Sequence, residues 1–110
     1  MAYIVTEVTT TPAGVNRYIS HDIFNPQAPT TAMRNKKKEL EEAGILTIET
    51  TVSTLENGST QVTSVFRWRS QTDREDHVTW LLSNFPNWYP DKEAYNTANG
   101  ITVVRTETTE

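Results

Sequence analysis

The sequence predicts an α+β fold of the ferredoxin-like type, in which a four-stranded antiparallel sheet carries both helices on one face. Two observations lead to this fold. Four segments are rich in β-branched residues, and the order of elements reads strand, helix, strand, strand, helix, strand. Such an order forms two split βαβ units. A length of 110 residues fits one domain, residues 1–110, with a core that needs no disulfide.

The first strand is expected over residues 2–11, where apolar groups fall on both faces. A Pro-Ala-Gly sequence ends it. Residues 12–29 then show neither the helical nor the strand period, and Asn-Pro and Ala-Pro pairs punctuate them. We therefore predict a long loop over residues 12–29, which contains Tyr18, His21 and Asp22. Loops of this length are usually functional or mobile.

The first helix is predicted over Ala32–Ala43, with Thr31 as its N-cap and Gly44 as its C-cap. Its apolar stripe is thin. Lys36 lies in the middle of the stripe. The three lysines 36–38 are followed by three glutamates, so we interpret the run as a solvated helix face with local ion pairs.

A long hairpin is predicted over Ile45–Ser70, closed at an Asn-Gly pair. A two-residue loop would divide the apolar residues between the two faces of the sheet. A three-residue loop, Glu56-Asn57-Gly58, gathers them on one face and puts a glycine where positive φ is needed. We therefore predict the register in which Leu46 faces Trp68, Ile48 faces Phe66, Thr50 faces Ser64 and Val52 faces Val62.

The second helix is predicted to begin near Asp73, because Thr72 and Glu75 fit a capping box, and to end before Pro86. Its apolar stripe holds Val78, Leu81, Leu82 and Phe85, with His77 at its edge and Trp80 nearly opposite.

The remaining segments are shorter. Residues 91–96 are expected to form a brief helical turn, residues 101–106 the last strand and residues 107–110 a polar tail. The first and last strands carry apolar residues on both faces, whereas the helices cover one face. A second copy packed sheet against sheet is the economical cover, so a homodimer is predicted.

Composition excludes several classes of function. The chain has no cysteine, which excludes disulfides and thiolate metal sites, and two histidines without ligand spacing predict no metal centre. A net charge of −4 argues against a nucleic-acid partner. No signal peptide and no apolar run long enough for a membrane span are seen, so a cytoplasmic protein is expected. No cofactor motif is present, and the sequence does not determine a function.

One part of the chain has a resemblance to a known family. Phe66-Arg67-Trp68-Arg69-Ser70, followed by His77 and by Leu82-Ser83-Asn84-Phe85, resembles the antibiotic biosynthesis monooxygenase-like family of dimeric α+β barrels. The resemblance extends loosely over residues 33–88. Two features depart from it: Phe66 stands where an acidic residue is common, and the loop after the first strand is longer. The first strand also lacks the asparagine of the haem-degrading branch, so no haem is expected.

The resemblance implies roles for four residues. Trp68 would wall a pocket, His77 would be the catalytic general base, and Arg67 or Arg69 would bind an anionic substrate oxygen. Each has a structural alternative. Trp68 would be a core or interface anchor and His77 a hydrogen-bonded residue at the helix edge, while the arginines would pair with Glu49 or Glu7.

The sequence therefore leaves two functions open. The first is a homodimer that binds a small molecule or has a structural role. The alternative, implied by the resemblance, is a cofactor-independent monooxygenase that acts on an aromatic or quinol-type molecule. A cavity lined by Trp68 and His77 would favour the alternative, and a filled interior would exclude it.

Overall fold

One antiparallel sheet and three helices make up the computed structural model, which describes residues 1–18 and 29–110. His21 and Asp22 of the predicted loop lie outside these residues. The elements in chain order are β1 (Tyr3–Thr11), α1 (Pro29–Glu42), β2 (Leu46–Thr54), β3 (Thr60–Trp68), α2 (Gln71–Asn84), α3 (Trp88–Ala98) and β4 (Thr102–Thr109).

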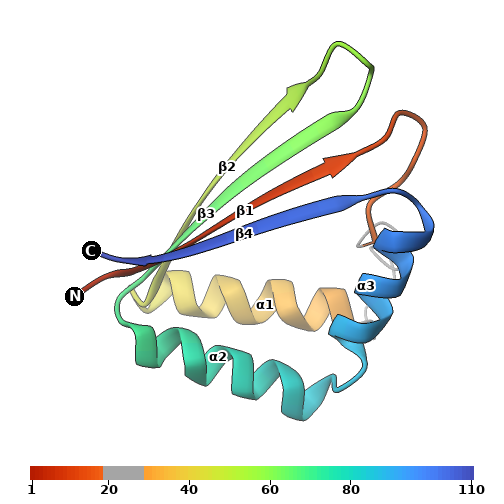
Figure 1. The fold of residues 1–110 in the computed structure, drawn as a ribbon. Coiled ribbons are helices and arrows are strands. Elements are labelled where there is room, and N and C mark those ends of the chain that lie inside the picture. Colours follow the sequence, from red (N-terminus) through yellow and green to blue (C-terminus); the bar gives the residue numbers. More distant parts are fainter. Residues whose placement is uncertain (19–28) are drawn as a thin grey trace.

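The sheet has the strand order β2-β3-β1-β4, and all neighbouring strands are antiparallel. Helices α1 and α2 lie side by side beneath one face, and α3 crosses the end of the sheet near the start of β4 (Figure 1). No helix of the described residues lies on the opposite face. The predicted ferredoxin-like βαββαβ arrangement is therefore confirmed, with α3 as an addition to it.

The hairpin has the predicted register. Leu46 lies opposite Trp68 and Ile48 opposite Phe66. The loop holds three residues, because the Leu55 amide donates to the Ser59 carbonyl (2.8 Å) across Glu56-Asn57-Gly58. Gly58 has φ +84°, a conformation that only glycine adopts without steric cost. The three-residue loop therefore places every side chain of β2 and β3 on the predicted face of the sheet.

The core lies at the end of the sheet where the chain termini meet. Tyr3, Val5, Leu46 and Trp68 form a buried cluster, and Leu40 packs against it. Toward the hairpin end the sheet rises away from the helices (Figure 1), and Val52 there is 63% exposed. The sheet and the helices therefore meet tightly at one end of the molecule and diverge at the other.

The start of α2 differs from the prediction. The N-cap is Ser70, whose hydroxyl accepts a hydrogen bond from the Asp73 amide (3.2 Å) and donates one to the Asp73 carboxylate (2.9 Å). The helix begins at Gln71, so Thr72 and Glu75 do not cap it. Two overlapping Ser/Thr-x-x-acid patterns occur in this stretch, and the earlier one forms because Ser70 directly follows the end of β3.

The start of α1 was also predicted too late. The helix begins at Pro29 instead of Ala32, so Thr31 is not its N-cap. Proline suits the first turn because its missing N–H has no partner there in any case. The predicted stop is confirmed: Gly44 has φ +74°, and the Ile45 amide returns to the Leu40 carbonyl (2.9 Å).

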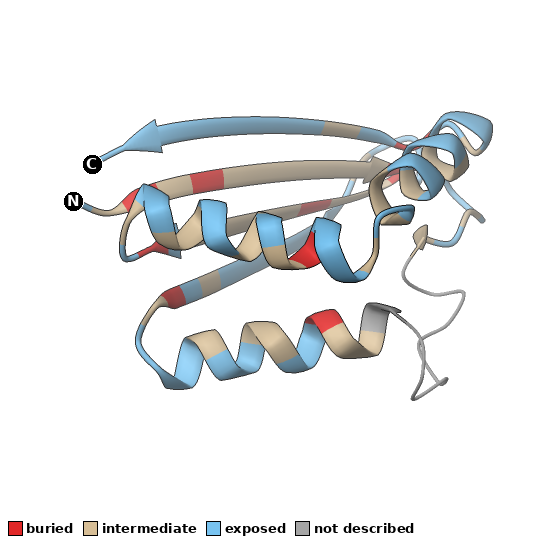
Figure 2. Ribbon diagram, turned by 90° about the horizontal axis from the view of Figure 1, so that it is seen from below, coloured by how far each residue is buried: buried red, intermediate tan, exposed pale blue. Residues whose placement is uncertain are grey.

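The C-terminal part holds two further corrections. The expected short turn at 91–96 is an eleven-residue helix, Trp88–Ala98. The last strand runs to Thr109, so most of the predicted polar tail pairs with β1, and the Glu110 amide donates to the Ala2 carbonyl (2.9 Å). Backbone pairing with β1 holds this polar segment as a strand, although almost all of β4 is exposed (Figure 2).

Candidate functional site

A cavity of about 220 Å³ lies where the sheet diverges from the helices. Strands β1, β3 and β4 contribute to its wall from above, and all three helices contribute from below and from the end. Its apolar wall includes Phe66, Trp68 and Leu81. The cavity is therefore built from segments that are far apart in the sequence.

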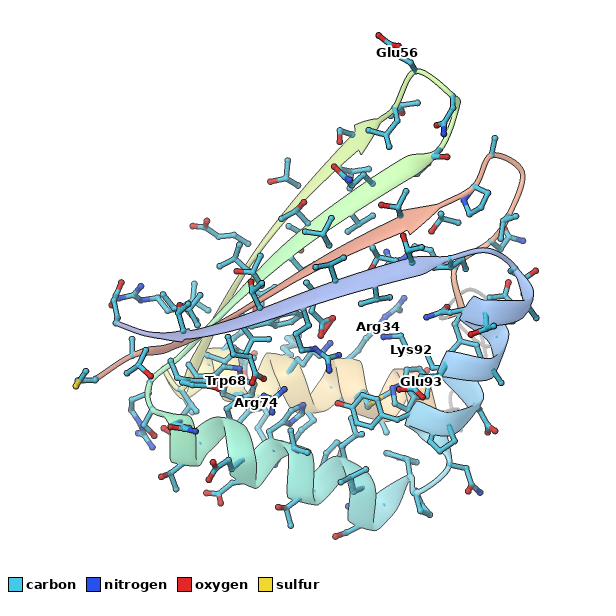
Figure 3. The ribbon with its side chains drawn as sticks, in the orientation of Figure 1. Arg34, Glu56, Trp68, Arg74, Lys92 and Glu93 are labelled. Carbon is cyan, nitrogen blue, oxygen red and sulfur yellow. The ribbon has the colours of Figure 1, made fainter. Side chains whose placement is uncertain are left out.

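The lining is strongly basic, although the chain as a whole has a net charge of −4. Glu7 is the one carboxylate among the described residues that line the cavity, against six cationic side chains. The side chains of Arg34 and Lys92 extend into the space between the sheet and the helices, and Trp68 and Arg74 lie toward its other end (Figure 3). The six cations are Arg17, Arg34, Lys37, Arg74, Lys92 and Arg105.

Two of these cations are neutralised by neighbours. Arg105 contacts the Glu7 carboxylate through Nε (3.1 Å) and Nη2 (2.9 Å). Arg74 pairs with Glu107 (3.0 Å), which also accepts a hydrogen bond from the Tyr3 hydroxyl (3.1 Å). Both ion pairs join β4 to a neighbouring element and hold a guanidinium at the cavity wall.

Lys37 and Lys92 are not paired in this way with any described residue. Within residues 1–18 and 29–110, no carboxylate forms an ion pair with either ammonium group. Lys37 lies over the Phe66 ring, 5.3 Å from its centroid. Burial lowers the pKa of both lysines, and the cation Arg17 lowers both further, while the charge of Glu7 opposes the shift. The site therefore holds two partly dehydrated ammonium groups.

His77 lies in an aromatic stack at the other end of the cavity. Its ring centroid is 5.3 Å from that of Trp68 and 5.8 Å from that of Trp80, and Lys36 covers the Trp80 ring. Burial, with Lys37, Lys36 and Arg74 nearby, lowers the His77 pKa to about 4. Its Nδ1 is buried without a hydrogen-bond partner in the described part of the chain. Trp80 is half-buried in this stack, although it lies nearly opposite the apolar stripe of the helix in the sequence.

Trp68 and His77 thus both line the cavity, as the resemblance implied, whereas Arg67 and Arg69 do not. Arg67 pairs with Glu110, and Arg69 pairs with Asp73 (2.8 Å). Both arginines are exposed on the outside of the molecule. The expected ion pairs of these arginines with Glu49 or Glu7 are therefore wrong. The role of the two arginines in substrate binding stays a prediction.

The cations of the cavity were not predicted from the sequence. The lysine run was interpreted as a solvated face, which fits the Lys36–Glu39 pair (3.8 Å) but not Lys37. One signal was available: Lys37 lies four residues after buried Met33 and three before Leu40, on the inward stripe of α1. Lys92 and Arg105 gave no such local signal, because their positions depend on how α3 and β4 pack.

The lowered pKa of His77 predicts a pH dependence of stability. In the unfolded chain the His77 pKa is about 6.5, so the unfolded state takes up the proton first as the pH falls. The stabilisation by neutral His77 is complete above pH 6.5 and is lost between pH 6.5 and about 4. We expect a loss of about 1–2 kcal/mol in unfolding free energy, allowing for solvent screening at this half-buried ring.

Urea unfolding at pH 7 and pH 4.5 measures this loss. The control is His77→Phe, which keeps a ring in the stack but cannot take up a proton. Both proteins should lose some stability over this interval, because their carboxylates titrate. The variant should lose less than the wild type, because it lacks the His77 imidazole. Equal losses would show that His77 is not held neutral by its surroundings.

No protein-family model matches the sequence, and no curated protein matches it. Solved structures do resemble the fold. A dimeric ferredoxin-like protein from an uncultured marine organism has a TM-score of 0.55 at 11% identity, over 98% of this chain and 94% of that one. A de novo designed protein, Foldit4, has a TM-score of 0.51 at 14% identity, over 100% and 99% of the two chains. The fold is ferredoxin-like.

Neither a cluster of metal ligands nor a membrane-spanning helix is found among the described residues of this ferredoxin-like fold. Across residues 1–18 and 29–110, no three His, Asp or Glu side chains are grouped as metal ligands. No helix in the same residues is long and apolar enough to cross a bilayer. The basic cavity is therefore the candidate functional site of the described residues.

Proposed function

We propose that this ferredoxin-like protein binds a small anionic molecule in the cavity between the sheet and the helices. The observation that carries the proposal is the pair Lys37 and Lys92, two half-buried ammonium groups with which no described carboxylate forms an ion pair. Burying a cation without a partner costs folding free energy, so such a pair is explained best by a ligand that supplies the missing charge.

The cavity wall favours anion binding in a second way. Aromatic and aliphatic side chains such as Trp68, Trp88 and Leu81 stand beside the cations and reduce the access of water. Coulomb attraction is several times stronger in such surroundings than in bulk water. A small anion would therefore gain more from these cations than it would from lysines on an open surface.

Inorganic phosphate is a suitable first probe. Thermal unfolding is followed in rising phosphate, with sodium chloride added to keep the ionic strength constant. Binding to the folded state alone raises the midpoint temperature, by mass action. We expect phosphate to raise it more than chloride does, and to shift the NMR amide signals of Glu7 and Ser64 in the cavity wall. Equal midpoints in the two salts, with unmoved signals, would contradict anion binding.

A second candidate is the cofactor-independent monooxygenase implied by the family resemblance. It is favoured by one observation: Trp68 and His77 line the same cavity. However, a base with a pKa of about 4 accepts a proton from a phenol of pKa near 10 at a cost of about 8 kcal/mol. Binding without this reaction is therefore better supported. Oxygen uptake with hydroquinone that His77→Phe abolishes would establish the alternative.

We also propose that the protein forms a homodimer through the open face of its sheet. Strand alternation and register place four apolar residues on that face, where no helix of residues 1–18 and 29–110 covers them. The dimeric ferredoxin-like neighbour has the same fold, which makes a second copy the preferred cover. The four residues are Ile4, Val8, Val65 and Val104. A cytoplasmic location and the absence of a nucleic-acid partner remain predictions from the composition.

Light scattering at micromolar concentration tests the dimer. We expect the wild type to have twice the mass of one chain, and Val104→Glu to have the mass of one chain, because the charge would be buried in the interface. Val104 is 60% exposed in the single chain. The control is Val52→Glu, at a valine of similar exposure on the helix-facing side of β2. A wild type with the mass of one chain would exclude the dimer.

A further inference from the structure

Glu7, in the middle of β1, interacts with three of the six cations of the cavity. Glu7 lies opposite Ser64 on one neighbouring strand and opposite Arg105 on the other. Its charge acts on both Lys37 and Lys92, and so does the charge of Arg17. Glu7 therefore interacts with cations from three segments: it pairs with Arg105 of β4, and its charge acts on Lys37 of α1 and Lys92 of α3, the two lysines on which Arg17 also acts.

The charges of this cluster do not balance. Arg17, Arg34, Lys37, Lys92 and Arg105 carry five positive charges and Glu7 carries one negative charge, which leaves an excess of four; Arg74 is paired with Glu107. A monoanionic ligand would leave an excess of three, whereas a dianion would leave two. Within a partly dehydrated cavity the smaller excess has the lower electrostatic energy. The charge count therefore favours a dianion.

The directions from which the cations come distinguish one dianion from another. Lys37 reaches the cavity from α1, Lys92 from α3 and Arg17 from the segment that follows β1. A carboxylate accepts hydrogen bonds largely in one plane. A phosphoryl group offers three oxygens arranged around phosphorus, and it suits donors that approach from several sides.

We propose that the ligand is a small phosphate monoester, whose dianionic phosphoryl group is bound by Lys37, Lys92 and Arg17, and that Glu7 is the internal counter-ion of this site. The inference rests on the proposed anion binding and names its ligand class. Glu7 holds Arg105 when the ligand is absent and competes with the phosphoryl group for the same cations. Its presence therefore lowers the affinity and keeps binding reversible.

Isothermal titration calorimetry at pH 7.5 tests the ligand class with three probes. These are glycerol 3-phosphate, its monoanionic methyl diester, and succinate as a dicarboxylate dianion. We expect glycerol 3-phosphate to bind at least tenfold more tightly than either of the others. Equal affinity of the diester would overturn the preference for a dianion, and equal affinity of succinate would overturn the phosphoryl group. Either result leaves the proposed anion binding intact. If none of the anions binds, inorganic phosphate included, both the anion-binding function and the proposed ligand class are overturned.

The role of Glu7 is tested with Glu7→Gln, which keeps the shape of the side chain and removes its charge. We expect the affinity for glycerol 3-phosphate to rise about three- to thirtyfold, because a competing carboxylate is lost. The matched control is Glu49→Gln, at an exposed glutamate on the opposite face of the sheet. Should the affinity fall or stay unchanged in a Glu7→Gln protein that melts as the wild type does, Glu7 would not be a competing counter-ion.

Discussion

Replacement of Trp68 by alanine is expected to lower the free energy of unfolding by about 3–5 kcal/mol, which is typical of a fully buried tryptophan. Trp68 is 4% exposed and packs in one cluster with Tyr3, Val5 and Leu46. Its ring also covers one side of His77. The substitution removes this packing at the closed end of the molecule, where the sheet and the helices are held together. Urea unfolding at pH 7 measures the loss.

Trp88→Ala is the matched control. Trp88 is half-buried and contacts Tyr18 at the opposite end of the cavity (5.1 Å between ring centroids). The Trp88→Ala substitution should lower the free energy of unfolding clearly less than Trp68→Ala does, because less apolar surface is removed from a buried position. The Trp68 variant should in addition raise the His77 pKa toward 6.5, since water would reach the ring. A loss below about 1 kcal/mol with an unchanged His77 pKa would contradict the central place of Trp68 in the core.

The double substitution Lys37→Met and Lys92→Met is expected to weaken binding of phosphate or glycerol 3-phosphate by at least about a hundredfold. Each hydrogen bond to a charged group contributes about 1.5–3 kcal/mol, so the loss of two accounts for this factor. The fold should be as stable as the wild type or more stable, because two desolvated charges are replaced by apolar side chains. Calorimetry and urea unfolding on the same samples give both quantities.

Lys38→Met serves as the control for this pair. Lys38 is adjacent in sequence to Lys37 but is exposed and does not line the cavity. Its substitution should leave binding unchanged. Binding that survives in the double variant, or that is lost equally in the control, would show that the anion is attracted by the surface as a whole.

The hairpin was predictable in full from the sequence because two independent signals agree on it. Gly58 provides the positive φ that a three-residue loop needs, and the apolar residues of both strands meet on one face in the corresponding register. The start of α2 was less determined, since Ser70 and Thr72 both fit a capping pattern. Only the end of β3 decides between them.

The candidate site was predictable in part. Trp68 and His77 were found because both occur in one recognisable stretch, whereas Lys92 and Arg105 come from segments that meet only in the fold. Glu7 and Arg105 pair across β1 and β4, whose register is not encoded by either strand alone. Arg67 and Arg69 were chosen for their closeness to Trp68 in sequence. Alternation along β3 places Arg67 on the face opposite Trp68, and Arg69 pairs with Asp73 outside the cavity.

The ammonium pKa values of Lys37 and Lys92, measured by NMR titration of the side-chain Cε signals with and without saturating phosphate, test the anion site most directly. We predict that both pKa values lie below the ordinary value of about 10.4 in the free protein, because of burial and the neighbouring cations. We predict that both rise when phosphate binds. Ordinary pKa values that phosphate leaves unmoved would contradict a basic cavity built to hold an anion.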